Sequence, residues 1–136
     1  MPLPTIKIKR DTRSSLLAGC FFMFLGVLFG AFGAHALQKY VDSQTLQVWE
    51  TGVRYQMFHG LALLALAAIA QFTEVPMKVG RRLLVVGTIL FSFNCYCYTV
   101  TGIKFFAMII PLGGTLLLVG WLWILAFVFL RTRASN

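Results

Sequence analysis

Acidic residues are scarce in this chain, which has only four Asp and Glu residues among its 136. Charged residues of both signs make up 12% of the sequence, against roughly 25% in soluble domains. The hydrophobic share is 59%, which is more apolar surface than a soluble core of this length could bury. The composition therefore excludes an ordinary soluble domain and indicates helices that are surrounded by lipid.

None of the acidic residues falls inside a long apolar run, and this absence excludes one class of transporter. Small multidrug exporters of similar size exchange protons for cations on a carboxylate inside the membrane. Here all the carboxylates lie in the polar stretches, so that mechanism is not expected. The acidic residues are Asp11, Asp42, Glu50 and Glu74.

Cysteine and histidine are also sparse, with three and two residues. Cys20, Cys95 and Cys97 lie within apolar runs and lack a metal-binding spacing, so neither a disulfide framework nor a zinc site is expected. No Ser, Cys or acidic residue stands at a recognisable catalytic spacing from a histidine. We therefore predict no enzymatic activity, no metal site and no cofactor.

Four long apolar runs separated by short polar stretches predict an all-α, polytopic membrane protein with four transmembrane helices. The Ala34-His35-Ala36 sequence resembles a cleavage site, but the apolar stretch before it is about 18 residues, longer than a signal peptide requires. The first run is therefore expected to remain as a span. The predicted spans are residues 16–34, 57–72, 83–100 and 104–130, with the last starting either at Lys104 and kinking at Pro111 or at Pro111 itself.

The second span is expected to have an amphipathic lead-in helix. Asp42-Ser43 offers a helix cap ahead of Gln44, and apolar residues then recur at helical spacing. The apolar stretch from Met57 is about 16 residues, marginal for crossing a bilayer, so the helix must include residues that precede it. This extension predicts that His59 lies just inside one face of the membrane.

The distribution of basic residues predicts the orientation. Residues 1–15 form an expected N-terminal arm and residues 131–136 an expected tail on either side of a membrane domain at 16–130. Together with the loop at 73–82, the arm and tail hold nine of the twelve Lys and Arg residues. Positive charge favours the cytoplasmic side, so both termini are predicted to be cytoplasmic. The positive charge therefore marks topology, and no nucleic-acid partner is expected.

Polar side chains near the second span predict a seam of hydrogen bonds between helices. Tyr55 and His59 are four residues apart, so both reach the same helix face, and Asn94 lies near the middle of the third span. Glu50 and Arg54 have the spacing of a helical ion pair. The predicted seam comprises His35, Glu50, Arg54, Tyr55, Gln56, His59 and Asn94.

Small residues predict close helix packing in two places. Gly26, Gly30 and Gly33 fall on one narrow stripe of the first span, which favours packing against a neighbouring span, with a homodimer contact as the alternative. In the fourth span, Gly113-Gly114 closely follows Pro111, which favours a kinked or locally unwound segment.

Four motifs occur in order along the chain. They are LFGAFGAHAL at 28–37, W-x-x-G-x-x-Y-Q-x-x-H at 49–59, LFS at 90–92, and PLGG at 111–114 followed by Gly120-Trp121. In these motifs the chain resembles the YgdD-like family, domain of unknown function 423. The resemblance implies a small four-span protein of bacterial plasma membranes, with relatives in mitochondria-bearing organisms and no established activity.

Three functional hypotheses follow. The favoured one is a non-catalytic structural or accessory subunit of a larger membrane assembly, with the bilayer and either another membrane protein or a second copy as partners. The second is a small-solute channel or carrier that uses an unwound segment at Pro111 and Gly113-Gly114. The third is a haem or metal protein in which His35 and His59 meet at one face of the membrane.

Overall fold

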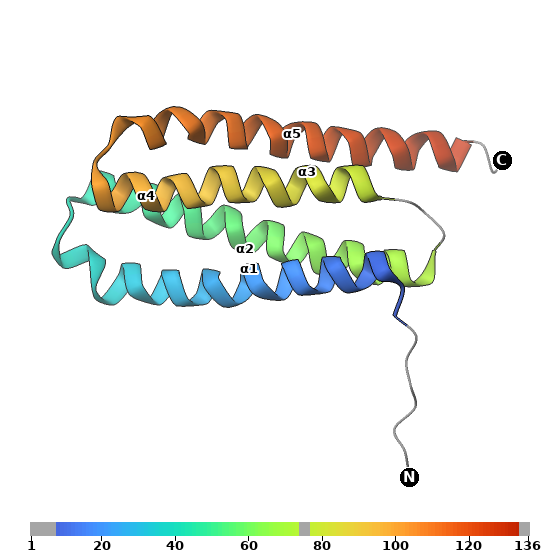
Figure 1. Cartoon of the computed structure of the whole chain (residues 1–136), viewed down its shortest axis with the longest axis horizontal. Helices are drawn as coiled ribbons and strands as arrows, with labels where there is room; N and C mark the ends of the chain where they lie inside the picture. The colour runs from blue at the N-terminus through green and yellow to red at the C-terminus, as the bar shows by residue number, and fades with distance from the viewer. Residues whose placement is uncertain (1–7, 74–76, 134–136) are drawn as a thin grey trace, which may run out of the picture.

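The computed structural model describes residues 8–73 and 77–133, and this part of the chain forms a bundle of antiparallel helical rods (Figure 1). Four helices are long and apolar enough to cross a membrane, which confirms the predicted all-α architecture. Residues 1–7 of the expected arm, Glu74 and Pro76 in the second loop, and residues 134–136 of the tail lie outside the described residues. The elements are α1 (Arg10–His35), η1 (Leu37–Lys39), α2 (Ser43–Phe72), α3 (Lys78–Thr88), η2 (Ile89–Phe93), α4 (Asn94–Thr101) and α5 (Lys104–Arg133).

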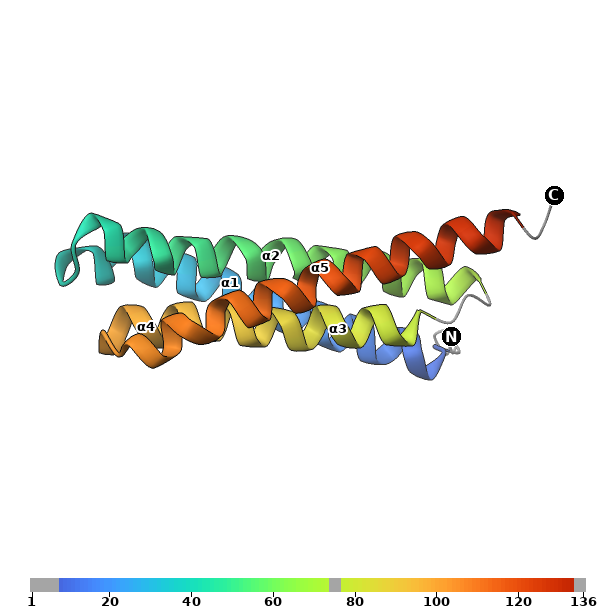
Figure 2. The ribbon, with the colours of Figure 1, turned by 90° about the horizontal axis from the view of Figure 1, so that it is seen from above.

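The π-helical segment η2 joins α3 and α4 into one continuous rod, which we call the third rod. Helix α1 packs along α2, and α5 packs along the third rod and crosses it at an angle (Figure 2). The central rods bury 39% and 44% of their most apolar stretch, whereas α1 and α5 each bury 22%. Helices α1 and α5 are therefore the outer helices of the bundle.

The first helix begins at Arg10, six residues before the predicted start of the first span at Leu16. Near its start, the Ser15 hydroxyl donates to the Asp11 carbonyl oxygen at 3.1 Å. Thr12 and Ser15 are buried, which shows that this polar stretch packs as part of the bundle. Residues 10–15, which the sequence assigned to the arm, therefore form the first part of α1.

The predicted cap of the second helix is confirmed. The Asp42 carboxylate accepts hydrogen bonds from the backbone N–H groups of Gln44 and Thr45, both at 2.9 Å. The backbone N–H of Thr45, followed by its hydroxyl, lowers the pKa of Asp42. From this cap α2 runs without interruption to Phe72, so the predicted lead-in and the apolar span form one helix.

The third rod ends in a turn at Thr101-Gly102. Gly102 has a φ of 68°, a left-handed conformation that glycine adopts without strain, and it ends α4. The last helix then starts at Lys104, as the first of the two alternatives predicted. It continues as an α-helix through Pro111 and Gly113-Gly114, so no unwound segment forms there.

The glycine stripe of α1 faces α2. An added Cβ on Gly33 would lie 2.8 Å from the Trp49 ring, and one on Gly19 would lie 2.9 Å from the carbonyl oxygen of Gly60. Gly26 and Gly30 lie between these two positions and also face α2. The small residues allow the two backbones to approach closely, and the stripe is occupied within the chain.

In the other half of the bundle, two backbones approach closely at Gly113. An added Cβ there would meet the backbone nitrogen of Phe91, and would lie 2.7 Å from the Phe91 Cα. Both are main-chain atoms of the π-helical segment, which cannot move aside as a flexible side chain can. On the adjacent Gly114, an added Cβ has only the Phe91 ring near it, at 3.7 Å.

These neighbouring glycines predict opposite responses to the same substitution. Gly113→Ala should lower the free energy of unfolding by about 1 to 3 kcal/mol, because α5 must move away from the third rod. Gly114→Ala should leave it unchanged or raise it by up to about 1 kcal/mol, because alanine favours the helix. Denaturant unfolding in mixed micelles measures both, and equal effects of the two variants would contradict this packing.

Candidate functional site

The side-chain amide of Gln56 connects three rods in the interior of the bundle. Its Nε2 donates to the carbonyl oxygen of Phe22 on α1 at 2.8 Å, and its Oε1 accepts from the Tyr96 hydroxyl of α4 at 3.0 Å. Gln56 is 5% exposed and Tyr96 is 6% exposed, so water does not compete for either hydrogen bond. The amide is therefore satisfied within the chain and holds α1, α2 and α4 in one arrangement.

An aromatic cluster lies between Gln56 and the end of the bundle that holds the α1–α2 loop. The Trp49 indole donates from Nε1 to the Phe29 carbonyl oxygen at 2.8 Å. The Tyr96 ring centroid lies 4.6 Å from that of Trp49 and 4.8 Å from that of Phe29. Three rods thus contribute one ring each to the cluster, which fixes their relative rotation.

His59 makes the second connection between distant helices. Its Nδ1 lies 2.7 Å from the Tyr55 carbonyl oxygen, and its Nε2 lies 3.1 Å from the indole Nε1 of Trp121 on α5. A carbonyl oxygen only accepts and an indole N–H only donates, so Nδ1 carries the proton and Nε2 accepts. The two partners therefore require neutral His59, and both of its ring nitrogens are used.

A groove of about 390 Å³ runs beside His59 between α2 and α5. The Tyr55 ring forms part of its wall and packs on Phe91, with ring centroids 4.6 Å apart. Pro111 and Thr115 of α5 also line it. The groove is largely apolar, and His59 and Trp121 satisfy each other within it.

The two histidines do not meet, so the prediction that they share one face of the membrane is wrong. His35 is the exposed last residue of α1, whereas His59 is buried near the middle of α2. An added Cβ on Gly60 would lie 3.2 Å from the Cβ of Phe22, so His59 is level with the middle of α1. The helical rise from there to His35 is about 20 Å, too far for both to hold one haem or one metal ion.

The other predicted seam residues divide between the surface and the interior. Glu50 and Arg54 are exposed and form no ion pair with each other. Asn94 is buried, but its Nδ2 donates to the Leu90 carbonyl oxygen of its own rod at 2.6 Å and not to another helix. The π-helical turn changes which backbone N–H groups pair with which carbonyl oxygens. The Asn94 amide supplies a donor to one of these carbonyl oxygens, that of Leu90.

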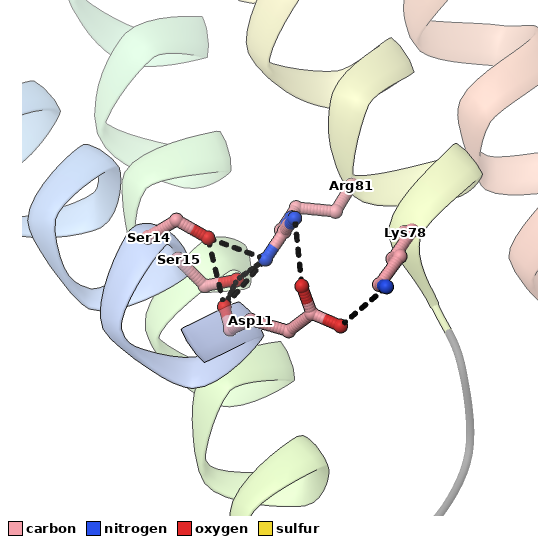
Figure 3. Close-up of polar contacts among 5 residues, drawn as sticks. All are labelled: Asp11, Ser14, Ser15, Lys78 and Arg81. Carbon is pink, nitrogen blue, oxygen red and sulfur yellow. Dashed lines mark hydrogen bonds and ion pairs between the residues drawn. The ribbon is translucent and has the colours of Figure 1, made fainter. Parts of the chain in front are cut away.

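A polar cluster that the sequence did not predict joins α1 to α3 (Figure 3). The Arg81 guanidinium of α3 donates to the Asp11 carbonyl oxygen and to the Ser14 and Ser15 hydroxyls, the latter two at 2.7 and 3.1 Å. Lys78 Nζ lies 3.4 Å from the Asp11 carboxylate. The only signal in the sequence was the charge of Lys78 and Arg81, which indicated topology and not a partner.

Trp121 was also missed, since in the sequence it occurs only in the Gly120-Trp121 motif, 62 residues from His59. The structure places it level with His59, where its indole N–H donates to the imidazole although the side chain is 44% exposed. Tyr96 gave no signal of its own, because its partner Gln56 is 40 residues away. Among the described residues no group of three His, Cys, Asp or Glu side chains could hold a metal ion.

Comparison with known proteins agrees with this architecture. The family described as "Protein of unknown function (DUF423)" matches residues 29–114. A UPF0382 membrane protein of Staphylococcus aureus (strain bovine RF122 / ET3-1) is 37% identical over 114 residues, which cover 84% of this chain and 93% of that protein. A UPF0382 membrane protein of Staphylococcus haemolyticus is 34% identical over 114 residues, with coverage of 84% and 93%. No solved structure matches the chain significantly.

The fold and its buried contacts define an integral membrane protein of the four-helix class. The chain belongs to the DUF423 family, whose members have no known function, and the resemblance inferred from its motifs is confirmed.

The contact between His59 and Trp121 predicts a measurable coupling between α2 and α5. In a double-mutant cycle of His59→Leu and Trp121→Phe, the interaction energy should be about 0.6 to 1.7 kcal/mol, the range of hydrogen bonds between membrane helices. Trp123→Phe is the matched control, because the Trp123 ring stacks on Phe127 in its own helix. Unfolding in mixed micelles provides the measurement, and a coupling equal to that of the control would contradict the assigned bond.

Proposed function

We propose that this protein is a non-catalytic structural or accessory subunit of a larger membrane assembly. The observation that supports this most is how the buried polar side chains are used. The side-chain hydrogen bonds of Gln56, Tyr96 and His59 hold the rods together. These groups serve the scaffold, because their polar atoms are already paired with other side chains or with main-chain carbonyls, and the groove beside His59 is largely apolar.

The outer position of α5 supports a partner on that helix. Helix α5 packs against the third rod, and among the described residues its backbone does not approach α1 or α2. Its opposite face carries large apolar side chains, with Leu118, Leu122 and Leu125 each more than 60% exposed. A neighbouring membrane helix could pack on this face without displacing any contact within the chain.

The carrier hypothesis loses the feature that motivated it. It depended on an unwound segment near Pro111, and α5 is helical from Lys104 to Arg133. The Thr115 hydroxyl donates to the Pro111 carbonyl oxygen at 2.9 Å, a contact within the helix. We therefore propose the accessory role alone.

Photo-cross-linking from native membranes tests this role. A photoreactive residue at Leu122 should give one dominant adduct with a different protein, of defined mass and near-stoichiometric yield in native gels. The same residue at Phe58, which is 60% exposed on the central helix α2, is the control and should give mainly lipid adducts. Lipid adducts alone at Leu122, with a monomer on native gels, would overturn the role. An adduct of only two copies of the chain would also overturn it.

We further propose that the protein lies in a bacterial plasma membrane with both termini in the cytoplasm. The start of α1 at Arg10 and the end of α5 at Arg133 lie at the same end of the bundle (Figure 1). That end also carries Lys78, Arg81 and Arg82 at the start of α3, in agreement with an excess of positive charge on the cytoplasmic side.

Reporter fusions at the two ends of the chain test this orientation. A reporter that is active only in the cytoplasm should be active at both ends, and a reporter that is active only outside should be silent at both. The reporter that is active only outside should be active when it is inserted after Lys39 in the α1–α2 loop. This insertion is the internal control. Opposite locations of the two chain ends would contradict the proposal.

A further inference from the structure

A recess of about 280 Å³ lies at the end of the bundle where α1 and α3 begin and α2 ends. It opens beside the cluster of Asp11 and Arg81 shown in Figure 3. Its residues come from three rods, so the recess exists only in the assembled bundle. It is lined by Lys9, Arg10, Asp11, Ser15, Leu66, Ala70, Thr73, Met77, Lys78 and Arg81.

The polar wall of this recess is strongly basic. Four of its described lining residues are Lys or Arg, and Asp11 is the one carboxylate among them. If Glu74 of the adjacent loop, which lies outside the described residues, is counted as well, basic residues still outnumber acidic ones two to one. An anion placed here would therefore meet a net positive field.

The basic residues differ in how far they are already engaged. The Arg81 side chain is 13% exposed and its hydrogen bonds are directed to α1. The Lys78 side chain is 56% exposed, and the carboxylate it approaches is itself 40% exposed. Arg10 is exposed at the start of α1. Lys78 and Arg10 are thus the cations best placed to contact a ligand.

The other wall of the recess is apolar. Leu66 and Ala70 belong to the last turns of α2, and Met77 precedes α3. A small soluble anion would gain nothing from these side chains. A molecule with a charged phosphate next to hydrocarbon would contact both walls at once.

We propose that this recess binds the headgroup of an anionic phospholipid. The headgroup phosphate contacts Lys78 and Arg10, and the glycerol and first acyl carbons lie on Leu66, Ala70 and Met77. The recess is at the end of the apolar spans, which is the depth of the lipid phosphates. Basic pockets between the ends of transmembrane helices recognise anionic headgroups by this combination of charge and position.

Lipid titration of the purified full-length chain in a neutral detergent tests the proposal. Dioleoyl phosphatidylglycerol should raise the midpoint of thermal unfolding in a saturable way, whereas dioleoyl phosphatidylcholine, with the same acyl chains, should not. Glycerol 3-phosphate distinguishes a lipid from a free phosphate, and it should have no effect at the same concentrations. Equal shifts with the two lipids, or the same shift with glycerol 3-phosphate, would overturn the proposal.

Charge variants locate the site and have matched controls on the same helices. Lys78→Gln and Arg10→Gln should each weaken phosphatidylglycerol binding about five-fold, the effect of roughly 1 kcal/mol per cation near a membrane surface. Arg82→Gln and Arg13→Gln make the same charge change outside the recess and should leave the half-saturation concentration unchanged. Equal weakening by the controls would show that binding follows net charge alone and would overturn the site.

Two further variants separate charge from damage to the fold. Asp11→Asn removes the carboxylate and releases Lys78, so it should tighten phosphatidylglycerol binding about five-fold. Lys78→Arg keeps the charge and should retain wild-type binding. Weaker binding by Asp11→Asn, or loss of binding in Lys78→Arg despite a normal unfolding transition, would contradict the proposed headgroup contact.

Discussion

The Gln56 amide, buried between three rods, cannot lose either of its hydrogen bonds without leaving a polar group in an apolar interior. This constraint is stronger than shape alone, because helices in lipid gain little from burying more hydrocarbon against one another. Gln56 sets the level of α1 against α2 through the Phe22 carbonyl, and the level of α4 against α2 through Tyr96. The aromatic cluster and the glycine contacts of α1 and α2 extend the arrangement that this amide fixes.

The two halves of the bundle are built differently. Helices α1 and α2 are joined along their whole length by small residues and by indole and amide donors that reach across to main-chain carbonyls. Helix α5 is held by the close approach of Gly113 to the π-helical segment and by the bond of Trp121 to His59. At the far end Arg81 connects α1 to α3, two helices that otherwise have little contact. The rods that are not consecutive in the sequence are therefore linked by polar contacts, α1 to α3 through Arg81 and α2 to α5 through His59.

Much of the fold could be predicted because lipid imposes simple rules. The apolar runs, the Asp42 cap and the Gly102 turn each depend on a few adjacent residues, and the structure contains all of them. The depth of His59 could not be predicted in this way. The boundary of the apolar run lies near Met57, but α2 begins at Ser43, and its earlier turns already pack against α1. A polar residue next to an apolar run can thus lie in the middle of a rod.

The contacts of the candidate site were hidden from the sequence for a related reason. Gln56 with Tyr96 and His59 with Trp121 depend on the relative rotation of helices that are far apart along the chain, which no local pattern encodes. In the sequence, the charge of Arg81 indicated only the topology, although its guanidinium donates hydrogen bonds to Ser14 and Ser15 of α1.

The π-helical turn at Ile89–Phe93 determines the direction, around the helix axis, of all the side chains that follow it in the third rod. Such a turn accommodates one residue more than an α-helical turn, and one residue corresponds to about 100° of rotation around a helix axis. A chain with a single deletion in this turn would swing the Tyr96 ring away from α2 and direct another face of α4 toward Gln56. The extra residue therefore acts as an angular spacer, so that α3 and α4 present differently oriented faces to the same neighbours.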